Sequence, residues 1–245
     1  MADSIWEVRV EGQARDLQRL AQVFTSAPLA VVRNDANEYL VTSDRFIGLT
    51  DHSAVHSAAS EVLTLLGGAL QFQFGSHEPL ETGPAFRRHG DGRRDTFIMV
   101  KGSELRLVTG DVTFVVTDKD GNPVAPPEPQ IPPLRKVVNL ALQRDAVAKA
   151  LRLLGSAPMG WIDLYRLVEV IEHDVGGEDA LVDADWTTRT QLKRFKHSAN
   201  SVSVAGDEAR HGKETTQSPR APMTLEEART YVDYLLHAWI DSRSV

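Results

Sequence analysis

The chain has 245 residues, of which 42% are hydrophobic and 25% are charged, a composition typical of a soluble globular protein. No run approaches the roughly 18 apolar residues that a membrane span requires, and the opening residues lack the features of a signal peptide, so we expect a cytoplasmic protein with no membrane partner. The absence of cysteine excludes disulfides, thiolate metal sites and cysteine nucleophiles. The net charge of −7 argues against a protein whose whole surface binds nucleic acid.

The first half of the chain alternates segments typical of strands and helices. In Ile5–Val10 every second residue is apolar, which predicts a half-buried strand. The same reasoning predicts strands at 29–33, 38–42 and 69–74, and amphipathic helices at 14–24 and 53–66, the second ended by Gly67-Gly68.

A polar stretch rich in glycine and arginine, 83–94, is expected to be a loop. After it, three short apolar segments at 96–101, 104–109 and 112–117 predict an antiparallel meander. Residues 1–122 therefore predict an α+β domain with one mainly antiparallel sheet and two helices.

Six prolines lie within PVAPPEPQIPP, residues 123–133. Such a segment favours extended polyproline II and predicts a spacer, here 123–135, although it also resembles a ligand for a proline-binding domain.

The remainder, 136–245, has apolar residues at helical spacing and predicts an all-α bundle of about four helices. One helix is expected to end at Gly155, another at Gly176-Gly177, and a weaker one to include Phe195. The last helix begins with a capping box formed by Thr224 and Glu227.

Several other segments carry weaker signals of a site. His52 and His56 stand four apart and could share a metal on one helix face, and 117–123 begins like a calcium loop. The arginine-rich 86–95 could attract a phosphate-bearing ligand, and the acidic residues between Glu169 and Asp174 could hold a cation. For each, a solvated helix face or turn is the simpler interpretation, and we predict no metal site.

The strongest candidate is RFKHSANSVSVAGDEARHGKE, residues 194–214, in an inter-helix position. Between 189 and 213 the chain carries six Lys or Arg residues against two acidic residues, a local charge of +4 in an acidic protein. Imidazole, guanidinium and amide groups bind anions and move protons, which favours a site. The alternative is an ordered connection between helices in which Asn200 and the histidines satisfy buried backbone groups.

The sequence lacks the common motifs of nucleotide-binding proteins and of hydrolases. It contains no phosphate-binding loop, dinucleotide fingerprint, nucleophile elbow or HExxH motif. We therefore expect no cofactor.

The whole chain resembles a group of uncharacterised soluble bacterial proteins that share this layout and carry RFKHSAN, GDEARHG and PMTLEEA. Its helical half is similar to the HEPN superfamily, in particular to the C-terminal domains of abortive-infection proteins. The family signature is an Arg and a polar residue such as Asn, followed after four to six residues by His. Asn200 matches the Asn and His211 the His, whereas Ala199 stands at the Arg position and ten residues separate Asn200 from His211.

The resemblance implies a homodimer through the helical domain and metal-independent cleavage of RNA, in which a cation holds the phosphate and an imidazole moves a proton. We therefore expect His211 and Arg210 to be catalytic, and Arg194, His197, Asn200 and Asp207 to bind the ligand, in a protein that binds or processes RNA or a nucleotide-like anion in stress or phage defence. One alternative is a non-catalytic protein-interaction module in which 194–214 is a structural connection. Another is a small-molecule sensor that uses 86–95.

Overall fold

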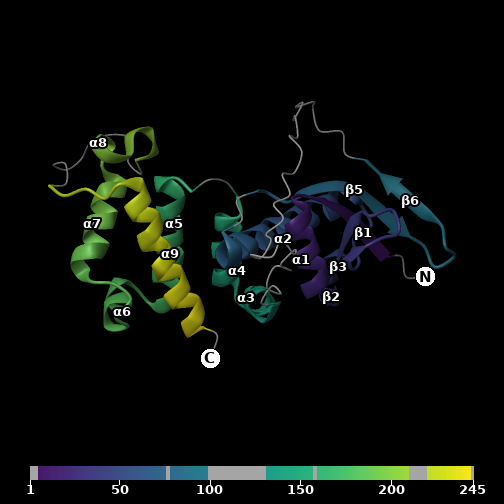
Figure 1. The fold of residues 1–245 in the computed structure, drawn as a ribbon, viewed down its shortest axis with the longest axis horizontal. Coiled ribbons are helices and arrows are strands. Elements are labelled where there is room, and N and C mark those ends of the chain that lie inside the picture. The colour runs from purple at the N-terminus through teal and green to yellow at the C-terminus, as the bar shows by residue number, and fades with distance from the viewer. Residues whose placement is uncertain (1–4, 76–77, 99–130, 157–158, 210–219, 244–245) are drawn as a thin grey trace, which may run out of the picture. The chain divides into compact units, whose positions relative to one another are not determined.

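The computed structural model describes residues 5–75, 78–98, 131–156, 159–209 and 220–243. They form two compact units, which we call the sheet unit (1–60 and 81–134) and the helical unit (61–80 and 135–245). The two-domain α+β architecture expected from the sequence is confirmed (Figure 1). None of the helices within the described ranges is long and apolar enough to cross a membrane.

The sheet unit is built on six strands in the order β2-β3-β4-β1-β5-β6, and every pair of neighbours is antiparallel. The strands are β1 (Ile5–Glu11), β2 (Thr25–Ser26), β3 (Leu29–Arg33), β4 (Tyr39–Ser43), β5 (Glu81–Arg88) and β6 (Arg94–Phe97). Helix α1 (Ala14–Val23) packs against β3, and the short helix η1 (Asp44–Phe46) follows β4. The alternation predicted for β1 is confirmed, since Trp6, Val8 and Val10 are buried.

Strand β5 occupies much of the segment that the sequence predicts as a polar loop at 83–94. The prediction was wrong because Gly83 and Pro84 are residues that usually interrupt strands. Here they lie where the pairing of β5 with β1 shifts register between Val8 and Val10, a bulge that accommodates a residue without a ladder hydrogen bond. Only the turn between Arg88 and Arg94 is a loop, so this is a β5–β6 hairpin.

Helix α2 runs from His52 to Phe74, so the helix end predicted at Gly67-Gly68 and the strand predicted at 69–74 are both wrong. A Cβ on Gly68 would overlap the carbonyl oxygen of Leu151, and one on Gly155 would overlap that of Thr64. The glycines therefore permit the backbones of two helices to meet. Burial of α2 offsets the cost of about 1 kcal/mol for a glycine inside a helix.

The helical unit contains the second half of α2 together with the helices that follow it. These are α3 (Ile131–Gln143), α4 (Asp145–Leu154), α5 (Trp161–Val175), α6 (Glu178–Asp183), α7 (Arg189–Asn200), α8 (Val202–Ala205), η2 (Gly206–Glu208) and α9 (Leu225–Ser242). The predicted helix up to Gly155 is interrupted at Arg144, whose backbone is extended (φ −132°, ψ 112°). The linker expected at 123–135 lies outside the described residues up to 130, and α3 already begins at Ile131. Two strands of the expected meander, at 104–109 and 112–117, also lie outside them.

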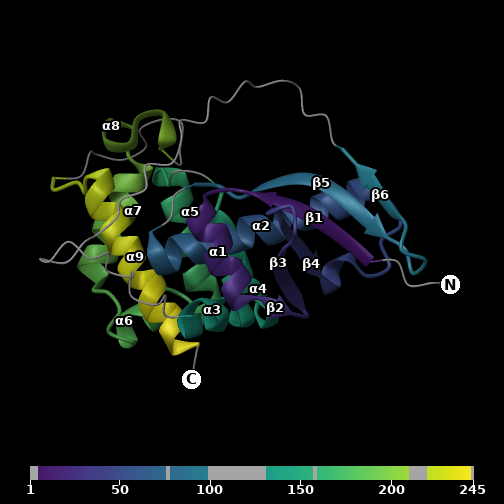
Figure 2. The same cartoon turned by 45° about the vertical axis from the view of Figure 1, so that its right-hand side comes forward.

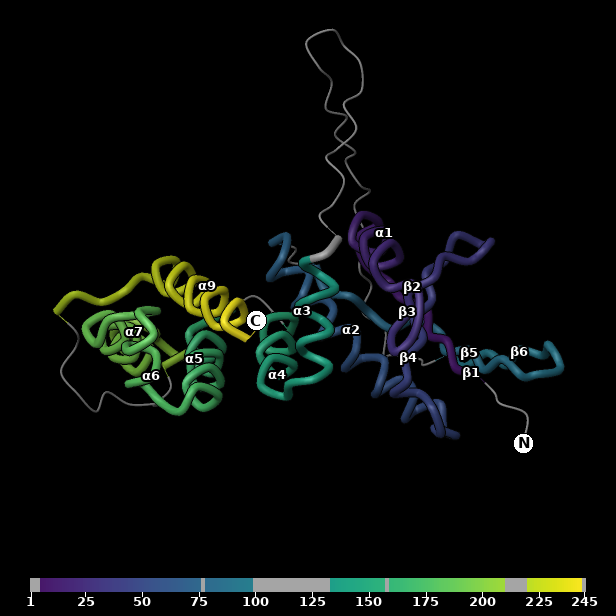
Figure 3. The backbone as a smooth tube through the Cα atoms, turned by 90° about the horizontal axis from the view of Figure 1, so that it is seen from below, coloured from purple at the N-terminus to yellow at the C-terminus, as the bar shows by residue number. Residues whose placement is uncertain are grey.

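Helices α5, α7 and α9 lie side by side in both views of the ribbon (Figures 1 and 2). The tube in Figure 3 follows the chain from α5 through α6 into α7. Helix α9 runs in the same direction as α5, because its start bonds to Met159 and its end to Asp174. The capping box predicted for α9 is confirmed, since the Thr224 side chain accepts from the backbone N–H of Glu227 and the Glu227 side chain accepts from that of Thr224.

Polar clamps hold α9 to α5. The Arg229 guanidinium donates twice to the carbonyl of Met159, at 2.9 and 3.0 Å. Near the other end, Asp174 accepts from Trp239 Nε1 at 2.8 Å and from Arg243 Nε at 2.9 Å. The sequence suggested that the acidic residues between Glu169 and Asp174 could hold a cation. At Asp174 the positive charge comes from the guanidinium of Arg243 in the same chain.

Candidate functional site

Helix α7 carries most of the candidate residues that the structure describes. It begins at Thr188, whose side chain accepts from the backbone N–H of Gln191 at 3.2 Å, as an N-cap does. Its buried side chains are Leu192, Phe195, Ser198 and Ala199, which follow one another at helical spacing. The polar residues of the predicted site are thus distributed around a helix that is anchored along one face.

Arg194 binds groups of its own chain. Its Nε donates to the carbonyl of Ala221 and its Nη2 to that of Pro222, each at 2.8 Å. Nη2 also lies 3.2 Å from both carboxylate oxygens of Glu227. The guanidinium therefore ties the start of α9 to α7, a structural role that the sequence analysis did not foresee.

The pKa of Glu227 is lowered in the same contact. The backbone N–H of Thr224 is the main cause, and the hydrogen bond from Arg194 adds to it. The ionised carboxylate is therefore the form that this end of α9 prefers.

Ser198 makes a second connection between α7 and the start of α9. Its hydroxyl is fully buried, donates to the carbonyl of Arg194 at 2.9 Å and accepts from the backbone N–H of Met223 at 2.9 Å. A serine inside a helix usually returns its hydroxyl to the preceding turn. The bond to Met223 joins residues 25 apart and had no signal in the sequence.

Lys196 lies between two carboxylates on another side of α7. Its Nζ is 2.7 and 2.8 Å from the two oxygens of Glu172 and 2.6 Å from Glu178. The Lys196 side chain is 19% exposed and that of Glu172 is 12% exposed. The pair is thus largely shielded from water.

Burial raises the pKa of the Glu172 carboxyl above its ordinary value, although Lys196 opposes the shift. Burial alone would lower the pKa of Lys196, but the hydrogen bonds to Glu172 and Glu178 raise it. Lys196 therefore stays charged and is committed to the two carboxylates.

The other predicted ligand-binding residues lie apart from Arg194. His197 and Asn200 line a cavity of about 320 Å³ together with Arg189, Lys193 and Lys196. The buried Oδ1 of Asn200 has no hydrogen-bond partner within the described part of the chain. The structure thus brings His197 and Asn200 together in one cavity, and Arg194 is not among the residues that line it.

Asp207 lies exposed in the short helix η2. Its neighbour Glu208 makes the structural contact, because Glu208 Oε2 accepts from the backbone N–H of Trp161 at 2.8 Å. Gly160 leaves space for this carboxylate, which a Cβ would overlap. Arg210 and His211, the predicted catalytic pair, lie outside the described residues.

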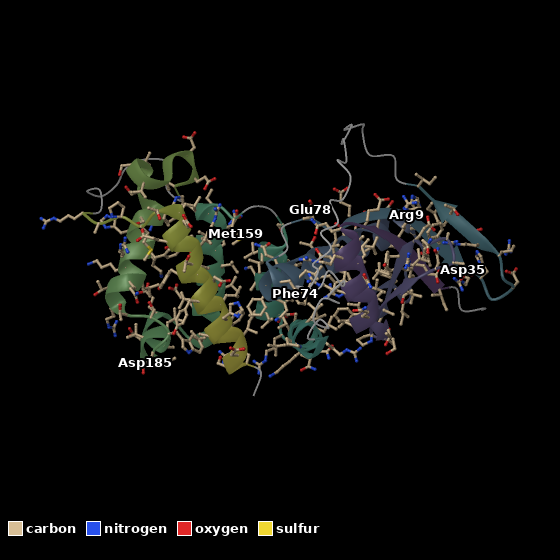
Figure 4. All side chains as sticks on the ribbon, in the orientation of Figure 1. Arg9, Asp35, Phe74, Glu78, Met159 and Asp185 are labelled. Carbon is tan, nitrogen blue, oxygen red and sulfur yellow. The ribbon has the colours of Figure 1, made fainter. Side chains whose placement is uncertain are left out.

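A larger cavity of about 830 Å³ opens between α7 and α9, and we call it the α7–α9 cavity. Its lining combines aromatic, hydroxyl and charged side chains: Asp185, Trp186, Thr187, Thr188, Gln191, Arg194, Met223, Thr224, Glu226, Glu227, Thr230, Tyr231 and Tyr234. Asp185, labelled in Figure 4, lies just after α6 on the surface of the helical unit. No pattern in the sequence indicates this cavity, because its residues come from segments about 40 positions apart.

In the sheet unit, the charged residues of 86–95 are engaged with one another and with β1. Arg88 lies 2.9 Å from Glu7, His89 lies 2.7 Å from Asp95, and Arg93 lies 2.8 Å from Asp91. The Arg94 guanidinium stacks 3.6 Å from the ring centre of Phe86. The pattern is that of a self-paired hairpin, so the sensor hypothesis gains no support here.

The two histidines at His52 and His56 are also part of the packed structure. His52 begins α2 and stacks on Phe97 with ring centres 5.1 Å apart, and His56 is buried. Across the described ranges, no group of three or more His, Cys, Asp and Glu residues could hold a metal. The calcium-like segment 117–123 lies outside those ranges.

Comparisons with protein-family models, curated proteins and solved structures found no match. The HEPN resemblance and the activity that it implies stay predictions.

Proposed function

We propose that the helical unit is a non-catalytic protein-interaction module that holds a polypeptide segment in the α7–α9 cavity. The main observation in support is that the Arg194 guanidinium already donates hydrogen bonds to two backbone carbonyls and to the carboxylate of Glu227. Arg194 therefore joins α7 to the start of α9 and forms part of the wall of the α7–α9 cavity. The part of 194–214 that the structure describes, residues 194–209, is on this account a structural connection.

The lining of the cavity supports a polypeptide as its occupant. Trp, Tyr, Arg and Met are enriched at protein interfaces, and Trp, Tyr and Arg dominate their binding energy. The cavity presents the aromatic residues Trp186, Tyr231 and Tyr234. Tyr234 has 58% of its surface exposed, which is unusual for a large aromatic residue on a packed helix.

The test is selection of peptides from a random displayed library on the full chain, followed by binding to a Tyr234→Ala variant. The expected result is a set of peptides that bind the wild type and lose affinity by at least tenfold for the variant, as for a residue that contributes about 1.4 kcal/mol or more. An unchanged melting temperature of the variant serves as control. Failure to select any peptide that depends on Tyr234 would overturn the proposal.

Self-association is the competing outcome, since the sequence predicts a homodimer through the helical domain. Sedimentation of the wild type and of Tyr234→Ala over a range of concentrations distinguishes the two. A dimer that the variant abolishes would assign the cavity to a second copy of the chain and contradict docking of a different polypeptide.

The cavity that His197 and Asn200 line favours a second candidate, binding or processing of RNA or a nucleotide-like anion. Lys193 and His197 could contact phosphate there. The Oδ1 of Asn200, which has no hydrogen-bond partner within the described ranges, could accept from a ribose hydroxyl. Incubation of a mixed RNA pool with the wild type and with His211→Ala tests the catalytic form. Cleavage that depends on His211 would overturn the non-catalytic assignment, and equal, unchanged RNA pools would support it.

A further inference from the structure

The α7–α9 cavity is negatively charged despite the basic character of α7. Four of its lining residues are ionised at neutral pH: Asp185, Arg194, Glu226 and Glu227. Arg194 and Glu227 pair with each other at 3.2 Å and cancel. Asp185 and Glu226 are exposed, and within the described part of the chain neither carboxylate has an ion-pair partner. The remaining charge is that of two carboxylates.

Aromatic rings line the same cavity, and one of them is fixed in place. The hydroxyl of Tyr231 bonds to that of Thr187 at 2.8 Å, and its ring centre lies 5.5 Å from that of Phe195 in the core. Trp186 and the exposed Tyr234 complete the aromatic lining. The face of such a ring attracts a cation, most strongly for Trp.

The backbone holds Asp185 in a conformation that favours glycine. Its φ is +57°, and the N–H of Trp186 bonds to the carbonyl of Leu181 at 3.1 Å, which is the hydrogen bond of a Schellman motif. Glycine is the usual residue at this position of the motif. Asp tolerates the conformation and places a carboxylate beside the aromatic residue that follows it.

An anion would find few donors in this cavity. Two helices begin at its edge, and helix starts often bind phosphate through free N–H groups. Here Thr188 already accepts from Gln191 N at 3.2 Å. The N–H groups of Thr224 and Glu227 are likewise taken up by the capping box of α9.

We propose that the α7–α9 cavity recognises a Lys or Arg side chain of the docked polypeptide, with the carboxylates of Asp185 and Glu226 facing its charge and the rings of Trp186 and Tyr234 covering its methylenes. This inference rests on the proposed function and names the chemistry of the partner. Charge complementarity selects this occupant, because the carboxylates of Asp185 and Glu226 lie beside aromatic surface that suits a long aliphatic stem.

The experiment is an NMR titration of the full chain with blocked tripeptides. The probes are acetyl-Gly-Arg-Gly-amide and acetyl-Gly-Lys-Gly-amide, and their neutral controls contain citrulline and acetyl-lysine. The indole N–H signal of Trp186 reports binding and is assigned with a Trp186→Phe variant. The expected result is saturable, millimolar binding of the charged peptides that is at least about threefold tighter than that of the neutral ones and weakens as salt is added.

Two variants remove the charge in different places. Asp185→Asn keeps a residue that tolerates a positive φ, and Glu226→Gln keeps the size of an exposed helix residue. Each is expected to weaken binding of the charged peptides about threefold and to leave the neutral ones unchanged. Asp241→Asn, also exposed on α9 but outside the cavity lining, is the control and should bind like the wild type.

The outcomes separate this inference from the proposed function. If library selection yields peptides that depend on Tyr234 but the charged and neutral probes bind equally, the choice of a cationic side chain is wrong and the docking function stands. If inorganic phosphate shifts the Trp186 signal and the charged peptides do not, the inferred sign of the ligand is wrong. If no selected peptide depends on Tyr234, the docking function itself fails.

Discussion

On one side of α7, Lys196 lies between Glu172 and Glu178 and is 19% exposed. On the other side, Arg194 reaches the start of α9 and is 36% exposed, next to a cavity whose carboxylates at Asp185 and Glu226 have no ion-pair partner among the residues that the structure describes. Both cations come from the same short basic run, yet one closes a buried ion-pair cluster and the other supports an open surface. The chemistry of a basic run therefore depends on the residues that each face of its helix contacts.

The largest effect on stability is expected from removal of the largely buried cation, Lys196. Lys196→Met leaves the Glu172 carboxylate without its partner in a largely buried position, and we expect the free energy of unfolding to fall by about 3 kcal/mol. Lys193→Met, exposed on the same helix, is the control and should change it by less than about 0.5 kcal/mol. Urea unfolding measures both. Similar effects for the two variants would contradict the assignment of Lys196 to a buried cluster.

A second variant tests the connection between α7 and α9. Ser198→Ala removes the acceptor of the Met223 N–H in a fully buried position, and an unsatisfied buried donor costs about 2 kcal/mol. Thr190→Ala, exposed on α7, is its matched control. A loss below about 0.5 kcal/mol in thermal unfolding would show that this bond does not hold the start of α9.

The Arg194 clamp is expected to matter less for stability, since its partners are exposed to water. Arg194→Met should lower the free energy of unfolding by about 1 kcal/mol, because solvent replaces part of the lost hydrogen bonding. Arg166→Met, whose side chain is 61% exposed and lies 3.9 Å from Asp163, should have no measurable effect. Binding of RNA that Arg194→Met abolishes at unchanged stability would contradict the structural role.

The smallest expected effect is on the pH dependence of stability, to which Glu172 and Glu227 contribute with opposite sign. The pKa of Glu172 is raised in the folded state, so the folded state binds more protons and the carboxyl's contribution to stability declines as the pH rises above 4.5. The pKa of Glu227 is lowered, so its contribution is present above 4.5 and is lost as the pH falls through the folded value.

The measurement compares the wild type with Glu172→Gln and with Glu227→Gln by urea unfolding between about pH 4 and pH 7. The wild-type advantage over Glu172→Gln should decrease with pH, and that over Glu227→Gln should increase. Slopes of the same sign would contradict the different environments of the two carboxylates.

The sequence predicted those parts of the fold that local patterns determine. The alternation of β1 and the capping box of α9 both appear as expected, because burial and capping act within a few residues. Helix α2 was predicted to end at Gly67 because its glycines resemble a stop signal. Their actual role depends on Leu151 and Thr64, which no local pattern connects to them.

The candidate site shows the same limit. The polar character of 194–208 was visible in the sequence, and so was its position between helices. The partners of Arg194 lie 27 to 33 residues away, and those of Lys196 lie 18 and 24 residues away. Periodicity could place these cations on a helix but could not show that their charges were already neutralised, nor that Trp186 and Tyr234 would line one cavity.

The account is tested most directly by locating a bound peptide. Hydrogen–deuterium exchange of the full chain, with and without a peptide selected from the library, reports protection along the sequence. The account predicts protection at 185–191 and 224–234, the two segments that line the α7–α9 cavity. Protection confined to the sheet unit, or to 196–208, which do not line that cavity, would contradict it.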